Sequence, residues 1–227
     1  MQWLEACPVC GNSYYRLGDG MLKCRGCGRK QSPRRLRRVA DLIDAFVADE
    51  SAAAAAKRLG VSYPAVHRHF GTLRRLCARI CEQEYEQRRD QPCEYEEYFY
   101  LERSKRSRPE AVFDAQNFLT FDYDGHLYTI VMPSLHQYRH RFIDDDLTPV
   151  YAAEFARFKR QSRIIKISSR HNNIVRFWDY FEKSIVRYKG VSDETFPLYL
   201  KEMEFKFNHS PETARTLLRE HYFRSPS

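Results

Sequence analysis

The sequence predicts an α+β protein in which two small segments precede a larger mixed domain. Two Cys-x2-Cys pairs organise residues 1–31, and apolar residues recur at helical spacing through residues 32–91. Beyond Pro92, alternating patterns come first and amphipathic helical patterns follow. Strands followed by helices are typical of an α+β domain. We therefore expect three domains, at residues 1–31, 32–91 and 92–227.

The composition is that of a soluble globular protein, with 43% hydrophobic and 30% charged residues among 227. No apolar run is long enough to cross a bilayer, and the first residues lack the pattern of a signal peptide. We therefore expect a cytoplasmic protein whose cysteines are reduced.

The positive charge is concentrated at the start of the chain. Residues 1–92 hold 17 Lys/Arg and 10 Asp/Glu, a balance of +7, which leaves +1 of the total +8 for all later residues. Such an asymmetry is typical of a nucleic-acid-binding head, although an acidic protein could also bind there.

The first domain is predicted to be a zinc ribbon. Cys7 and Cys10 form one knuckle, and Cys24 and Cys27 form the second. Zinc takes four tetrahedral ligands, and each knuckle can present two thiolates to one ion. The strands expected on either side of Gly18-Asp19-Gly20 would form a small hairpin that metal stabilises. The alternative is four unligated thiols or a redox pair.

The remaining cysteines do not extend this pattern. Cys77 and Cys81 lie one turn apart on a predicted helix, and Cys93 stands alone. Cys77 and Cys81 could share a metal, but no further ligand is placed to complete its shell. We expect both to be small buried side chains.

The second domain is predicted to be a helix-turn-helix. An apolar face formed by Leu36, Val39, Ile43 and Phe46 or Val47 marks its first helix. Ser51 is the expected N-cap of a helix over residues 52–59, Gly60 the turn, and Ser62 the cap of the next helix.

The second helix of such a unit reads the major groove with its N-terminal residues. The expected reading residues are Ser62, Tyr63, Ala65, His67 and Arg68. Arginines ahead of the first helix are expected to contact phosphates: Arg34, Arg35, Arg37 and Arg38. The alternatives are a helical bundle for protein contacts and a solvated linker.

The third domain begins with strands. We expect strands at residues 94–101, 117–123, 126–132 and 147–151, with Asp124-Gly125 as a two-residue hairpin turn. Leu119, Phe121 and Tyr123 share one face of their strand. Three helices follow, on the pattern from Ile174 to Tyr188, from an N-cap at Ser192, and from Ser210-Pro211.

The chain resembles small zinc-ribbon insertion-sequence transposases of the DDE class, which have a ribonuclease-H-like catalytic domain. The matching motifs are Phe177-Trp178, Gly190, Thr195-Phe196 and the run from Leu198 to His209 near the end, with residues 94–99 and the hairpin ending at Pro133 upstream. The likeness covers nearly the whole chain. It implies duplex DNA as partner, and a homo-oligomer or a subunit of a larger DNA-bound assembly.

The resemblance also implies three carboxylates that hold Mg²⁺ for DNA cleavage and strand transfer. The matching positions are Glu96, Ala153 and Val175, and neither alanine nor valine can bind a metal. A displaced set, Glu96, Glu154 and Glu182, would require shifts in register. Mg²⁺ is therefore expected only if this second set is catalytic.

The preferred interpretation is a sequence-specific, non-catalytic DNA-binding protein derived from a transposase, acting as a regulator or as a targeting or structural subunit. The first alternative is an active DDE transposase that uses displaced glutamates. The second is a zinc-bearing adaptor for protein partners.

Overall fold

The computed structural model describes residues 5–102, 113–134, 172–188 and 190–224. Contacts divide the chain into two compact units. The first unit combines Met1–Glu84 with Phe205–Ser227, and the second is Tyr85–Glu204. Both boundaries fall within helices, α3 (Tyr63–Glu86) and α7 (Phe196–Asn208). This division differs from the three expected segments, since the first two share one unit with the end of the chain. The three functional domains stay a prediction.

The first unit begins with a three-stranded antiparallel sheet of β1 (Tyr14–Arg16), β2 (Leu22–Cys24) and β3 (Lys30–Gln31). The predicted hairpin is confirmed, with Gly20 at a φ of 79° in its turn. The short strand β3 was not predicted, because two residues carry no readable alternation.

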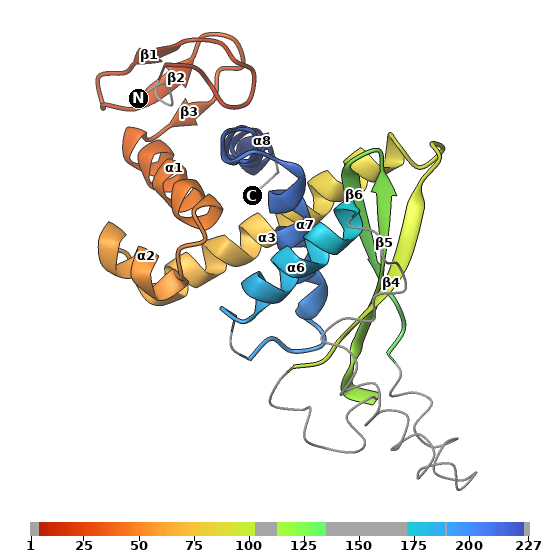
Figure 1. The fold of residues 1–227 in the computed structure, drawn as a ribbon. Coiled ribbons are helices and arrows are strands. Elements are labelled where there is room, and N and C mark those ends of the chain that lie inside the picture. Colours follow the sequence, from red (N-terminus) through yellow and green to blue (C-terminus); the bar gives the residue numbers. More distant parts are fainter. Residues whose placement is uncertain (1–4, 103–112, 135–171, 189, 225–227) are drawn as a thin grey trace, which may run out of the picture. The chain divides into compact units, whose positions relative to one another are not determined.

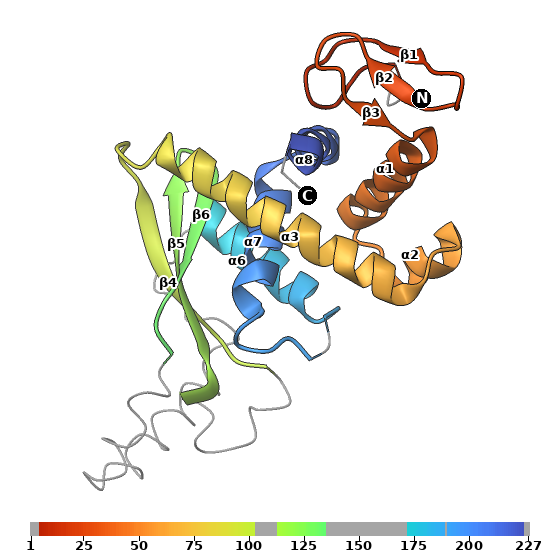
Figure 2. The same ribbon diagram turned by 180° about the vertical axis from the view of Figure 1, so that it is seen from behind.

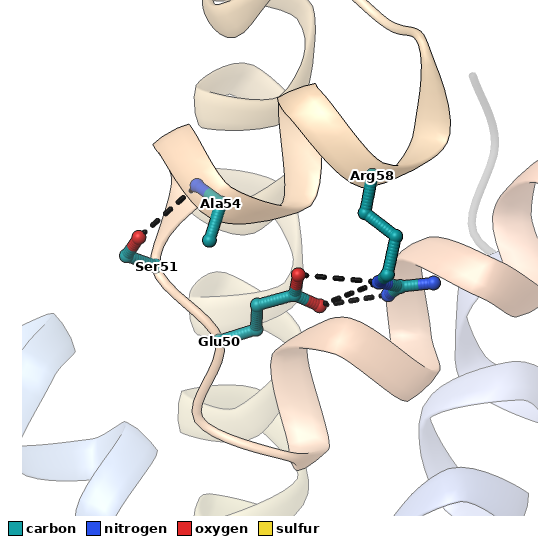
Figure 3. Close-up of polar contacts among 4 residues, drawn as sticks. All are labelled: Glu50, Ser51, Ala54 and Arg58. Carbon is teal, nitrogen blue, oxygen red and sulfur yellow. Dashed lines mark hydrogen bonds and ion pairs between the residues drawn. The ribbon is translucent and has the colours of Figure 1, made fainter.

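Three helices follow, α1 (Pro33–Val47), α2 (Ala52–Leu59) and α3. The predicted apolar face of α1 is confirmed by the burial of Leu36, Val39, Ile43 and Phe46. Oγ of Ser51 accepts a hydrogen bond from the Ala54 amide at 3.1 Å, so the predicted cap of α2 is also confirmed (Figure 3). Gly60 ends α2 in the left-handed region at a φ of 62°, as expected of the turn.

The C-terminal helix α8 (Pro211–Arg224) completes this unit by packing against α1 (Figures 1 and 2). Oγ of Ser210 accepts from the Thr213 amide at 3.2 Å, and Pro211 opens the helix as predicted. The apolar cluster that joins α1, α2 and α3 also includes Phe205 and three residues of α8: Ala214, Leu218 and Phe223.

The second unit contains an antiparallel sheet in the order β4 (Glu94–Tyr100), β5 (Gln116–Tyr123), β6 (His126–Val131), with β5 in the middle (Figure 1). Asp124 and Gly125 have φ angles of 51° and 93°, as the predicted two-residue turn requires.

Helix α6 (Asn173–Ile185) packs on β5. The indole Nε1 of Trp178 donates to Oγ1 of Thr120 at 3.0 Å, so α6 covers the face of β5 that carries Phe118 and Thr120. Leu119, Phe121 and Tyr123 share the other face, in agreement with their predicted alternation.

The predicted start of α7 at Ser192 is wrong. The helix begins at Phe196, and residues 192–195 form a turn in which the Ser192 carbonyl accepts from the Phe196 amide at 2.8 Å. Pro197 accounts for this start, because proline favours the first turn of a helix. Phe207, expected on the apolar stripe, is only half-buried, whereas Phe205 is fully buried.

The expected strand at residues 147–151, together with Ala153 and Glu154, lies outside the described residues. Within the described part of the chain, no helix has both the length and the apolar character needed to cross a membrane.

Candidate metal centre and nucleic-acid interface

The four knuckle cysteines converge on one point. The Sγ atoms of Cys7, Cys10, Cys24 and Cys27 all lie within 4.8 Å of one another, with 3.7 Å between Cys7 and Cys27 and 3.3 Å between Cys10 and Cys24. Zinc–sulfur bonds of ~2.3 Å would place tetrahedral ligands about 3.8 Å apart. The donor set therefore fits a structural zinc ion, as the sequence predicted.

The two knuckles have the same backbone geometry. The amide of Gly11 donates to the Cys7 carbonyl at 2.8 Å, and that of Gly28 donates to the Cys24 carbonyl at 3.2 Å. Both glycines adopt left-handed φ angles, 74° and 70°. Glycine is suited to both positions because it lacks the Cβ that disfavours this conformation.

Asn12 supports the cluster from outside it. Its Nδ2 lies 3.5 Å from Sγ of Cys10 and 3.3 Å from the Cys10 carbonyl. The hydrogen bond from the Asn12 side chain lowers the pKa of the exposed Cys10 thiol to about 6, which favours the metal-binding thiolate. Asn12 was not predicted as part of the site, although its place two residues after Cys10 is a local signal.

The other cysteines take no part in this cluster. Cys77 and Cys81 are buried in the apolar core of the first unit, as predicted, and Cys93 is exposed. Among the described residues, the group of four is the only set of three or more His, Cys, Asp or Glu side chains positioned to share a metal.

The start of α3 presents polar side chains to solvent. Ser62, Tyr63, His67 and Arg68 are exposed and Ala65 is half-buried, whereas Val66 and Phe70 enter the core as expected. The rings of Tyr63 and His67 lie 5.8 Å apart. Four of the five predicted reading residues are therefore accessible to a ligand.

A bidentate ion pair closes the turn that precedes α2. The guanidinium of Arg58 donates to both carboxylate oxygens of Glu50, at 2.7 Å in the closest contact (Figure 3). With the Ser51 cap, this pair joins the two ends of α2 to one another.

The arginines of α1 lie on its exposed side. Arg34, Arg35, Arg37 and Arg38 are all exposed. Burial lowers the pKa of His69, and the nearby charges of Arg68, Arg35 and Arg38 lower it further. His69 on α3 therefore lies close to the positive charge of both α1 and α3.

Tyr222 of α8 contacts His69 directly. Its hydroxyl lies 2.8 Å from Nδ1 of the imidazole. His69 and Tyr222 were not predicted as partners because no local sequence pattern joins them. Their contact arises only when α8 packs on this unit.

In the second unit, Glu96 lies beside the start of α6. Its Oε1 accepts from Nδ2 of Asn172, the N-cap of α6, at 3.2 Å. Its Oε2 is buried and accepts no hydrogen bond from the described residues. Val175, three residues after this cap, is fully buried.

Among the described residues, neither Glu96 nor Glu182 belongs to a group of three or more side chains positioned to share a metal. Glu182 is engaged by the Tyr98 hydroxyl at 2.6 Å, and Val175 offers no oxygen. Glu154, the remaining member of the displaced set, lies outside the described residues.

Comparisons with known proteins show one distant similarity. Over 80 residues, or 35% of the chain, the sequence is 29% identical to an "uncharacterized transposase-like protein" of Haemophilus influenzae. The matched region spans 65% of that relative. No family model matches the chain, and no solved structure matches it. The chain is thus distantly similar to a transposase-like protein and carries a cluster of four cysteines suited to a structural metal.

Proposed function

We propose that the chain is a sequence-specific duplex DNA-binding protein derived from an insertion-sequence transposase, acting as a regulator or as a targeting or structural subunit. The observation that carries this proposal is the exposed start of α3, presented after the Gly60 turn beside the exposed arginines of α1. A helix-turn-helix places this part of its second helix in the major groove.

The exposed side chains have two roles in this proposal. Arg68 and His67 on α3 offer hydrogen-bond donors to base edges, and arginine pairs most often with guanine. Arg34, Arg35, Arg37 and Arg38 neutralise phosphates and contribute affinity without regard to sequence. The charges of Arg35, Arg38 and Arg68 all act on His69, which supports a shared DNA-facing surface.

The transposase origin is supported by the second unit. An antiparallel β4-β5-β6 meander followed by a helix on its face is the beginning expected of a ribonuclease-H-like domain. The distant transposase-like relative supports the same origin. We expect the protein to act as a homo-oligomer or as a subunit of a larger DNA-bound assembly.

The experiment that tests DNA binding is selection of bound duplexes from a random pool, followed by anisotropy titrations on the selected site and on a scrambled site. Arg68→Ala should reduce discrimination between the two by roughly 1–3 kcal/mol. Arg35→Ala should weaken both alike and reduce the salt slope by about one. Lys183→Ala, on an exposed part of α6, is the charge-matched control.

If the wild-type chain binds no duplex, or binds it without salt dependence, the proposal is wrong. An adaptor for protein partners would then be the better interpretation, since it neutralises no phosphates.

An active transposase is the second candidate, and one observation favours it. The carboxylate of Glu96 has a buried oxygen without a described hydrogen-bond donor, beside the N-terminal end of α6. A nicking and strand-transfer assay with Mg²⁺ or Mn²⁺ distinguishes the candidates. Cleavage by the wild type that disappears in Glu96→Ala would establish an enzyme, whereas binding without cleavage supports the non-catalytic protein.

A further inference from the structure

The sheet of the cysteine-bearing segment has one buried and one exposed face. Leu22, Cys24 and Gln31 are buried on the first face. Strand register places Tyr15 opposite Lys23, and Lys23 opposite Lys30, so these three side chains form a row across the other face. Tyr15 and Lys30 are exposed, and Lys23 is half-buried.

Arg25 adds a third positive charge to this row. Its Cζ lies 5.4 Å from the centroid of the Tyr15 ring, a cation–π distance, and its backbone amide donates to the Ser13 carbonyl at 3.0 Å. The aromatic ring therefore restrains the guanidinium at Tyr15, which lies directly opposite Lys23. We call Tyr15, Lys23, Arg25 and Lys30 the basic row.

The basic row is unfavourable for the isolated fold. Lys23 and Lys30 are directly opposite each other on neighbouring strands, where like charges are destabilising. Among the described residues, neither lysine forms an ion pair, and no acidic residue lies between Lys23 and Arg38 in the sequence. The acidic residue of the adjacent turn, Asp19, is engaged by the Met21 amide at 2.9 Å.

We propose that the basic row is a second DNA-binding surface, which contacts the phosphate backbone of duplex DNA independently of α3. Complementary charge supports this partner, since a run of phosphates removes the repulsion between Lys23 and Lys30. Strands in a sheet lie about 4.8 Å apart, and the long lysine side chains can reach separate phosphates from there. The row reads no bases, so its contribution is the same on every duplex. This inference rests on the proposed DNA binding and extends it to the cysteine-bearing sheet.

The test compares the full chain with Lys23→Gln/Lys30→Gln on random-sequence duplexes over a range of salt concentrations. Each phosphate contact contributes about 0.9 to the slope of log K against log salt, so the slope should flatten by about 1.8. Lys183→Gln/Arg187→Gln removes the same charge from exposed positions of the second unit and should keep the wild-type slope. Tyr15→Leu, which frees Arg25, should weaken binding on all sequences by a smaller factor.

Two outcomes overturn the inference, and they differ from failure of the proposed function. If the wild type binds duplex with salt dependence but the lysine variant keeps its slope, only the basic row is wrong. If the lysine variant loses affinity for single-stranded RNA and not for duplex DNA, the assigned partner is wrong. If the wild type binds no duplex, the proposed function fails together with this inference. Thermal unfolding of the variants at or above the wild-type temperature excludes misfolding as the cause.

Discussion

Tyr222 and His69 are hydrogen-bonded at 2.8 Å although 153 positions separate them in the sequence. Three further contacts join the end of the chain to its beginning: Arg29 to the Phe223 carbonyl, Arg219 to the Ala6 carbonyl and Arg215 to Asp44. The proposed DNA-binding head is therefore a discontinuous unit that includes α8.

Leu218→Ala should destabilise this head. Leu218 is fully buried in the cluster shared with α1 and α3, and removal of a buried leucine side chain costs about 2–5 kcal/mol. Hydrogen exchange of the α1 amides measures the loss. Val186→Ala, at a side chain that is 58% exposed, should change stability by less than about 0.5 kcal/mol. Undiminished protection of α1 in Leu218→Ala would mean that α8 is not part of the head.

The stability of the head should decline as the pH falls below the ordinary histidine pKa of about 6.5. Burial and neighbouring arginines lower the pKa of His69 in the folded chain. The unfolded chain therefore binds the proton more readily, and acid favours unfolding. His69→Gln keeps a partner for Tyr222 and should reduce this pH dependence, as followed by thermal unfolding between about pH 8 and pH 5.

His221, whose pKa burial also lowers, accounts for part of the remaining pH dependence. The matched variant is His221→Gln. Its reduction of the pH dependence of stability should add to the reduction caused by His69→Gln. Identical pH dependence in wild type and His69→Gln would contradict the prediction.

Metal content should depend on the knuckle cysteines alone. We expect one zinc ion per chain, lost in Cys24→Ser because three thiolates cannot complete the tetrahedral shell. Cys93→Ser, at an exposed cysteine outside the cluster, should retain the ion. Elemental analysis after dialysis measures both. Equal zinc content in the two variants would exclude the proposed ligand set.

Gly26→Ala should weaken metal retention without removing a ligand. A Cβ at Gly26 would lie 2.4 Å from Nδ2 of Asn12, so the amide must move away from Sγ of Cys10. Loss of such supporting hydrogen bonds costs about 10–100-fold in metal affinity. Competition with a chromogenic chelator measures the change. Gly18→Ala is the control, because a Cβ added at Gly18 would have no atom within 4 Å. Equal metal affinities of the two variants would mean that Asn12 has no role in metal retention.

Ser51→Ala should destabilise the head by about 1 kcal/mol because the Ala54 amide loses its acceptor. Ser32 precedes α1 but makes no side-chain capping hydrogen bond, so Ser32→Ala should have a smaller effect. Urea unfolding followed by circular dichroism compares the two. A larger loss in Ser32→Ala would contradict this assignment of the caps.

Features that depend on close neighbours in the chain could be predicted from the sequence. The Cys-x2-Cys spacing predicted the cluster of four thiols, Ser51 and Gly60 predicted the ends of α2, and Asp124-Gly125 predicted the turn between β5 and β6. Each of these features depends on residues a few positions apart, because a single turn or helix cap sets the local backbone geometry. Ser192 failed as a cap because the nearby Pro197 places the helix start later.

The distant segments that share a core could be identified only from the folded chain. It placed Leu218 and Phe223 with α1 and α3, Tyr222 on His69, and Glu96 beside Asn172. An apolar stripe on a helix shows that one face is buried but does not identify its partner, because the hydrophobic effect is non-directional. The basic row likewise depends on strand register, which sequence alone left open for the two residues of β3.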